Sequence, residues 1–191
     1  GQYNLTQIGS VFQQAIQPYY ALGGTPNTDT IDDYNFRFAA ELVEGPLLKA
    51  SMPTLEKLEP VRLVGQFATG QGFNTLVDAP LIILGTNTVR DARIVARTTA
   101  NALQVRTGIA QISAGEALEI YSTTLNADIA DNKVNFLLNL KDVNEKNKYR
   151  VGGMFEQLDS VSYAFRINPD SLMLNYDRWA MAPDNLVRMR N

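Results

Sequence analysis

Residues 134–140 read VNFLLNL and residues 161–167 read VSYAFRI. In the first stretch Val134, Phe136 and Leu138 occupy every second position, and mostly polar residues lie between the apolar ones in both stretches. Side chains of a β-strand point alternately to the two faces of a sheet, so this period of two predicts strands with one buried face. These two stretches decide the fold class, which we expect to be mainly β.

Seven further runs between residues 61 and 176 have the length and composition of strands, and turn-forming residues separate many of them. The runs are 61–68, 81–85, 92–98, 103–112, 117–124, 149–152 and 172–176. The expected turns are at 114–115, 131–132, 144–147 and 168–170. Short strands joined by tight turns predict an antiparallel β-sandwich or barrel, of which the jelly roll is one form.

The N-terminal segment has a different period. Between residues 5 and 17 the apolar side chains recur at spacings of three and four, which predicts a helix that ends before Pro18. Residues 36–43 are compatible with a helix or a strand, and we expect a short helix followed by irregular chain. The sequence therefore predicts one domain with three parts: residues 1–60 as an N-terminal helix and acidic irregular arm, 61–176 as the β-sandwich body, and 177–191 as a packing tail.

Charge is unevenly distributed along the 191 residues. Residues 1–60 contain seven acidic and three basic side chains, whereas residues 61–110 contain five arginines and two aspartates. We expect these two regions to attract each other within one subunit or between subunits.

The absent residue types exclude several classes of chemistry. The chain has no cysteine and no histidine, which excludes disulfides, imidazole acid–base catalysis and most zinc, copper or haem ligation. No apolar run approaches the roughly 20 residues of a membrane-spanning helix. The residues after Gly1 lack the basic and apolar segments of a leader peptide, so we expect that a leader was either absent or already removed. We expect a protein without a cofactor that is not an enzyme.

Three motif searches favour ordinary structural roles. The Gly70-Gln71-Gly72 run lacks the third glycine of a dinucleotide-binding loop, so we expect a turn there. Residues 128–132 supply oxygen atoms but lack the spacing of a calcium-binding EF-hand loop. Paired carboxylates could act in glycoside hydrolysis, yet each pair also suits solvated turns. The pairs are Glu116 with Glu119, Asp128 with Asp131, and Asp32 with Asp33.

A candidate basic patch lies in the expected strand 92–98. Alternation places Arg93 and Arg97 on one face of that strand, with Ile94 and Ala96 on the other. Arg90 and Arg106 are close in sequence and could extend the patch toward phosphate groups or acidic partners. We favour a solvated face or salt bridges with the acidic arm over nucleic-acid binding, because interleaved aromatic residues are absent.

Both ends of the chain are too apolar to remain in solvent. The residues expected to lie between subunits are large apolar and aromatic ones, of types enriched in protein interfaces. They are Phe12, Ile16, Tyr19, Tyr20, Trp179 and Met181. The sequence leaves open whether these terminal arms dock on their own domain or on a neighbour.

These features favour a non-enzymatic structural subunit that self-assembles with copies of itself or with other structural proteins, most plausibly as a capsid or tail protein of a virus or phage particle, located in the virion. The alternative is an extracellular or cell-surface β-sandwich module that binds carbohydrate or protein. A carboxylate-dependent enzyme is the third candidate, and it requires two carboxyl groups about 5 to 9 Å apart across a cleft.

Overall fold

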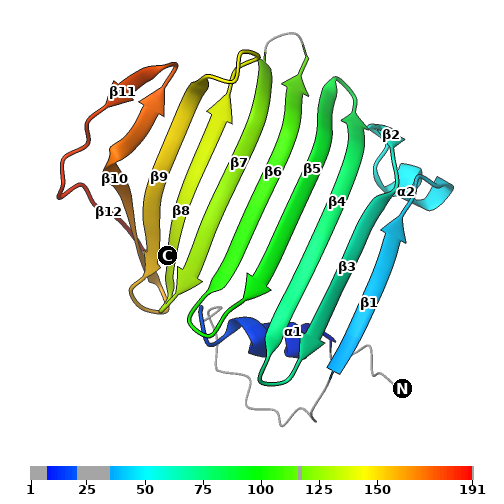
Figure 1. Ribbon diagram of the computed structural model, residues 1–191, viewed down its shortest axis with the longest axis horizontal. Helices are drawn as coiled ribbons and strands as arrows, with labels where there is room; N and C mark the ends of the chain where they lie inside the picture. The colour runs from blue at the N-terminus through cyan, green and yellow to red at the C-terminus, as the bar shows by residue number, and fades with distance from the viewer. Residues whose placement is uncertain (1–7, 21–34, 116–117, 191) are drawn as a thin grey trace.

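The computed structural model of the chain describes residues 8–20, 35–115 and 118–190. These residues form one antiparallel sheet of twelve strands with two short helices, α1 (Ile8–Ile16) and α2 (Pro46–Ser51) (Figure 1). The prediction of a mainly β, antiparallel fold is confirmed.

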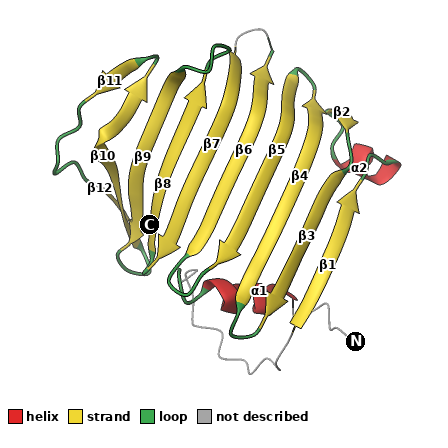
Figure 2. Cartoon of the chain, viewed as in Figure 1, coloured by secondary structure: helices red, strands yellow, loops and turns green. Residues whose placement is uncertain are grey.

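Most of the sheet is a meander, in which strands adjacent in sequence are hydrogen-bonded neighbours (Figure 2). The order is β1-β3-β4-β5-β6-β7-β8-β9-β10-β11, while β2 pairs with β4 and β12 pairs with β10. The sheet is not closed, and the described strands form a single layer, so they build neither a barrel nor the two packed sheets of a sandwich. The strands are β1 (Asn35–Leu42), β2 (Leu55–Leu58), β3 (Val61–Ala68), β4 (Gly72–Leu84), β5 (Asn87–Thr98), β6 (Leu103–Ala114), β7 (Leu118–Ala130), β8 (Lys133–Lys141), β9 (Asn147–Gln157), β10 (Ser162–Leu174), β11 (Asp177–Trp179) and β12 (Val187–Arg190).

Two local predictions were wrong. The short helix expected at residues 36–43 is strand β1, because Phe36 and Phe38 alternate with Arg37 and stack toward Phe67 of the neighbouring strand. The turn expected at 168–170 is instead an irregularity inside β10, where the register with β9 shifts between Ile167 and Leu172. The turn predicted at Gly70-Gln71-Gly72 is confirmed, and both glycines have positive φ, at 73° and 76°.

The pairing register segregates charge between the two faces. Residues paired across an antiparallel ladder share a face of the sheet. Successive pairs therefore form rows that run across the strands, and three of these rows lie on one face. These rows form the inner face and contain no charged residue. The rim row is Phe36, Phe67, Phe73, Thr98, Leu103, Ile129, Val134, Phe155 and Phe165; the middle row is Phe38, Gly65, Thr75, Ala96, Val105, Ala127, Phe136, Gly153 and Ile167; the open row is Ala40, Leu63, Val77, Ile94, Thr107, Leu125, Leu138, Val151 and Leu172.

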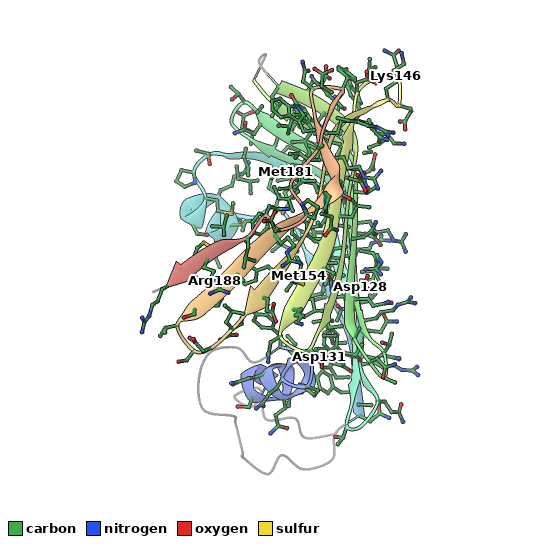
Figure 3. The ribbon with its side chains drawn as sticks, turned by 90° about the vertical axis from the view of Figure 1, so that its left-hand side faces the viewer. Asp128, Asp131, Lys146, Met154, Met181 and Arg188 are labelled. Carbon is green, nitrogen blue, oxygen red and sulfur yellow. The ribbon has the colours of Figure 1, made fainter. Side chains whose placement is uncertain are left out.

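The alternate residues form the outer face, which carries the charged side chains of these strand segments. One outer row, which we call the polar row, contains only one apolar residue in nine. Its members are Arg37, Gln66, Asn74, Arg97, Gln104, Asp128, Asn135, Met154 and Arg166. Figure 3 shows Asp128 on the side of the sheet opposite α1.

Helix α1 covers the rim row. Val11 of the helix forms a buried cluster with Phe67, Phe73 and Leu103, and no member of the open row belongs to this core. The rings of Phe67 and Phe73 are stacked with centroids 5.2 Å apart, and Phe36 stacks on Phe67 at 5.3 Å. The cluster that α1 covers therefore lies at one end of strands β1 and β3–β7, and further buried apolar residues, including Leu55, Leu58, Leu81 and Ile120, lie toward the opposite end.

Two glycines in the middle row allow aromatic rings to lie against the sheet. A Cβ atom at Gly65 would lie 2.6 Å from the ring of Phe38, its cross-strand partner, and one at Gly153 would lie 3.2 Å from the ring of Phe136. The ring of Phe38 therefore occupies the space that a side chain at Gly65 would need, whereas at Gly153 the carbonyl oxygen of Arg166 lies closer still than the Phe136 ring.

The apolar alternation changes phase along a line that crosses β4 to β7. The pairing skips Pro80, Asp91 and Ser122 there, and Asp91 and Ser122 have positive φ. On the far side of this line, a row of apolar residues occupies the alternate strand positions, which on the near side belong to the outer face. It comprises Leu58, Ile82, Val89, Ile112 and Ile120. The pairing register between these strands is the same on both sides of the line, so the interruption is a local irregularity of the backbone and not an inserted residue.

Neither described helix is long and apolar enough to cross a membrane.

The rim core predicts a contrast between two neighbouring positions of β3. Phe67 is 3% exposed, whereas Val64 lies on the outer face and is 42% exposed. Replacing Phe67 by Ala should reduce the free energy of unfolding by about 3–5 kcal/mol, and replacing Val64 by Ala by less than about 1 kcal/mol. Chemical denaturation of the two variants measures both values, and equal losses would contradict the assignment of the core to the α1 side.

Candidate interaction surfaces

The open row of the inner face is the first candidate surface. Its apolar side chains are half-buried or exposed, and Ile94 at its centre is 39% exposed. Figure 3 shows that α1, α2 and the β10–β12 end of the sheet lie on the same side of it. The inner face thus combines an apolar, charge-free surface with walls at its borders.

The two edges of the sheet form the second candidate surface. Among the described residues, ten of the sixteen exposed large apolar side chains lie at the two opposite ends of the sheet. Near β1 and α2 they are Leu42, Val43, Leu47 and Met52; near β10–β12 they are Leu174, Tyr176, Trp179, Leu186, Val187 and Met189. Within the described residues β1 pairs only with β3, and β11 and β12 pair only with β10, so both edges present unpaired backbone groups.

The N-terminal interface residues of the sequence hypothesis pack within this chain. Ile16 and Tyr19 lie against the rim core, and the Tyr19 hydroxyl donates a 2.7 Å hydrogen bond to the carbonyl oxygen of Thr99. Burial raises the pKa of the Tyr20 phenol, and the nearby Tyr163 adds to the shift. The side chain of Phe12 lies outside the described part of the structure. This arm therefore docks in cis through Ile16 and Tyr19.

The C-terminal interface residues are placed differently. Trp179 of β11 pairs with Leu172, at the end of the open row, and is 56% exposed. Met181 is half-buried and its backbone N–H donates to the carbonyl oxygen of Pro169. On β12, Val187 and Met189 are exposed and alternate with Arg188. Trp, Met and Arg are enriched in protein interfaces, so this edge has the composition of a contact surface.

Three of the four residues in the predicted basic patch gather on the outer face. Arg106 pairs with Val95, which lies between Arg93 and Arg97 on β5, so the three guanidinium groups occupy neighbouring positions. Arg90 lies beyond the interruption at Asp91 and belongs to the other half of the strand.

Carboxylates of the sheet itself neutralise part of this patch. Arg106 donates to Asp128 at 2.7 Å, and Arg93 lies 3.7 Å from Asp78. Arg97 donates to the side-chain oxygen of Gln104, whose amide nitrogen donates to Asp128. For Arg93 and Arg106 the expected salt bridges therefore form, but with acidic residues of neighbouring strands instead of the acidic arm.

The candidate acidic pairs do not converge on a catalytic or metal site in the described residues. Asp128 is engaged by Arg106, while Asp131 and Asn132 form a turn with positive φ values of 51° and 59°. Glu116, Asp32 and Asp33 lie outside the described residues. No group of three acidic side chains that could hold a metal ion is found in the part of the chain that the structure describes.

A hydrogen-bonded clasp attaches the C-terminal edge to the rest of the sheet. Asp142, in the β8–β9 turn, accepts backbone N–H donors from Asn144 and Lys146 and a 2.7 Å hydrogen bond from the Tyr176 hydroxyl. The Tyr176 hydrogen bond, followed by the Lys146 N–H, holds the pKa of Asp142 below its ordinary value. The same hydrogen bond raises the pKa of Tyr176. The clasp thus fixes the β10–β11 turn, three residues before Trp179.

No protein-family model matches the sequence, and comparisons with curated proteins and with solved structures found no match.

The clasp predicts an acid-sensitive C-terminal edge. The carboxylate pKa is lower in the folded chain than the unfolded value of about 3.9, so the clasp stabilises the edge above that pH and is lost as pH falls through the lowered value. Trp179 is the sole tryptophan and reports on β11. We expect its fluorescence to change in acid, and Asp142→Asn to show the altered emission already at neutral pH.

Asp159 supplies the control for this titration. Its carboxylate also accepts backbone hydrogen bonds, from Val161 and Ser162, but in the β9–β10 turn. Asp159→Asn should leave the Trp179 emission and its acid response unchanged. An equal effect of both substitutions would show that the response reports global unfolding and would contradict the local clasp.

Proposed function

We propose that this chain is a non-enzymatic structural subunit that self-assembles edge to edge. The observation that carries the proposal is the concentration of exposed apolar side chains at the two opposite edges of an open sheet. Leu47 in α2 is 87% exposed, and Trp179 and Val187 at the other edge are 56% and 57% exposed. Contiguous exposed apolar residues beside unpaired strands are features of surfaces that other protein covers.

The two edges differ from each other, which determines the symmetry of the contact. One edge is the eight-residue strand β1 beside α2, and the other consists of the short strands β11 and β12. A contact between unlike surfaces is heterologous, and it produces a ring when the rotation closes or a filament when it does not. Shells and tubes of virus or phage particles are assemblies of this type, and we assign the chain to that class of structural protein.

The accessible surface supports a subunit that is completed by neighbours. No large side chain among the described residues is fully buried. Covering each large apolar side chain at an edge would contribute about 1.5–3 kcal/mol to association.

Complementary edge variants test this proposal. Leu47→Glu blocks one edge, and the double substitution Trp179→Glu with Val187→Glu blocks the other. Sedimentation over a concentration series should show growth for the unmodified chain and for Val143→Glu, a 67% exposed control in the β8–β9 turn. Each edge variant should remain a monomer, because a charge introduced into an apolar contact must be desolvated.

Mixing the two edge variants distinguishes a heterologous contact from a symmetric one. Each variant retains one intact edge, so the mixture should form one-to-one dimers that grow no further. A monomeric unmodified chain at every concentration, or a mixture that fails to dimerise, would contradict edge-to-edge assembly.

A second candidate function, an apolar-ligand binding module, is favoured by the inner face. The open row carries no charge and is not part of the core, and several middle-row side chains beside it are small, including Gly65, Ala96 and Ala127. A surface of this kind can receive an elongated apolar occupant without leaving a buried charge unpaired.

Adjacent positions of β5 provide a matched test of the ligand-binding candidate. Ile94 lies on the inner face and Val95 lies on the outer face near three arginines. An apolar fluorescent dye should bind the unmodified chain and Val95→Glu, whereas Ile94→Glu should weaken binding on the order of tenfold. Equal dye binding by both variants would exclude the inner face as the ligand site.

A further inference from the structure

The outer face contains a polar hollow at the end of strands β1 and β3–β5. Its volume is about 300 Å³, and its ten lining residues include two arginines and no acidic residue. The residues are Asn35, Arg37, Gln66, Ala68, Gln71, Gly72, Phe73, Asn74, Arg97 and Thr98. The hollow thus has a net positive lining on a chain whose overall formal charge is −3.

The register explains why the hollow forms there. Arg37, Gln66, Asn74 and Arg97 are consecutive members of the polar row, each on a different strand. On the rim side of this row, Ala68 pairs with Asn35 and Gly72, so two of the smallest residues lie beside four long polar side chains. The positive φ of 76° at Gly72 favours glycine at this turn, and a Cβ atom there would clash with the side chain of Thr98.

The charges of the two arginines are not balanced by the ion pairs of this face. Arg62, Arg93 and Arg106 form salt bridges with Glu41, Asp78 and Asp128 respectively, each across one pair of strands. Within the described residues Arg37 and Arg97 form no salt bridge, and Arg97 donates only through Nε to the neutral amide oxygen of Gln104. Its two terminal guanidinium nitrogens remain available for a ligand.

We propose that this hollow binds a small, multiply charged phosphate oxyanion, with Arg37 and Arg97 as the charged ligands and the amides of Gln66 and Asn74 as neutral donors between them. Guanidinium groups bind phosphate oxygens through charge-assisted, bidentate hydrogen bonds. The two arginines stand three strands apart, roughly 14 Å at the backbone, and their side chains extend into the same hollow. This separation favours an oxyanion with two charged groups, such as inorganic diphosphate, over a single phosphate.

The test is a titration of the intact chain with inorganic diphosphate at low ionic strength. Calorimetry measures the affinity, and amide chemical shifts locate the residues that respond. We expect binding that weakens as salt is added, with shifts at residues 66–74 and 97. Arg37→Gln and Arg97→Gln should each weaken binding on the order of tenfold or more. Both side chains are exposed, so circular dichroism should show the fold unchanged.

Arg93→Gln is the matched control, because Arg93 lies four residues from Arg97 on the same face but is paired with Asp78. It should retain the affinity of the unmodified chain. Equal weakening by Arg93→Gln would indicate diffuse attraction to a basic face, and no detectable binding of diphosphate by the unmodified chain would also overturn the proposal. The titration is performed on monomeric edge variants as well, so that its outcome is independent of assembly.

Discussion

The segregation of charge across a single-layer sheet is the constraint on which the rest of this structure depends. A one-layer sheet has two faces, and of the two short described helices only α1 contributes a buried residue, so most of the cohesion comes from the backbone ladder. The cluster of Phe36, Phe67 and Phe73 beneath Val11 supplies a packed core at one end. Away from that end, the sheet persists because long strands pair continuously with their neighbours in a meander, which keeps hydrogen-bonded partners close in sequence.

This architecture explains why the apolar residues are distributed as they are. In a two-layer fold the inner rows would be buried by a second layer, and the edges would be short or protected. Here the open row stays half-exposed, and exposed apolar side chains concentrate at both ends of the sheet. Joining copies at the edges would cover those ends and would also lengthen the charge-free inner face, so assembly and binding on the inner face are compatible properties of one sheet.

The sequence predicted features that depend on local alternation. Residues 134–140 and 161–167 lie in strands because a period of two is visible without any knowledge of neighbours. Residues 36–43 were misassigned because the partner that selects the strand, Phe67, is about thirty residues away. The number of layers could not be predicted either. Alternation shows that one face of a strand is apolar, but it does not show which other element, if any, covers that face.

The same limit applies to the candidate surfaces. Arg93, Arg97 and Arg106 could be grouped from sequence, because two lie on one strand and the third follows in the next hairpin. Arg90 is separated from them by Asp91, whose positive φ is a backbone feature that its sequence neighbours do not indicate. The polar hollow escaped prediction altogether, because its four polar-row members come from four strands and are brought together only by the register.

Register also restricts how an edge contact could form. Trp179 continues the open row through its pairing with Leu172, and Ala40 lies at the opposite end of the same row. Pairing that places Trp179 beside an inner residue of the next β1 would keep the apolar face continuous across the joint. A slip by one residue would bring Trp179 to the outer face of β1, which carries Arg37 and Glu41, because each step along a strand reverses the side on which a side chain lies. The alternation of β1 therefore favours registers that place Trp179 on its apolar face, and this preference gives an open edge a specificity that a bare backbone ladder lacks.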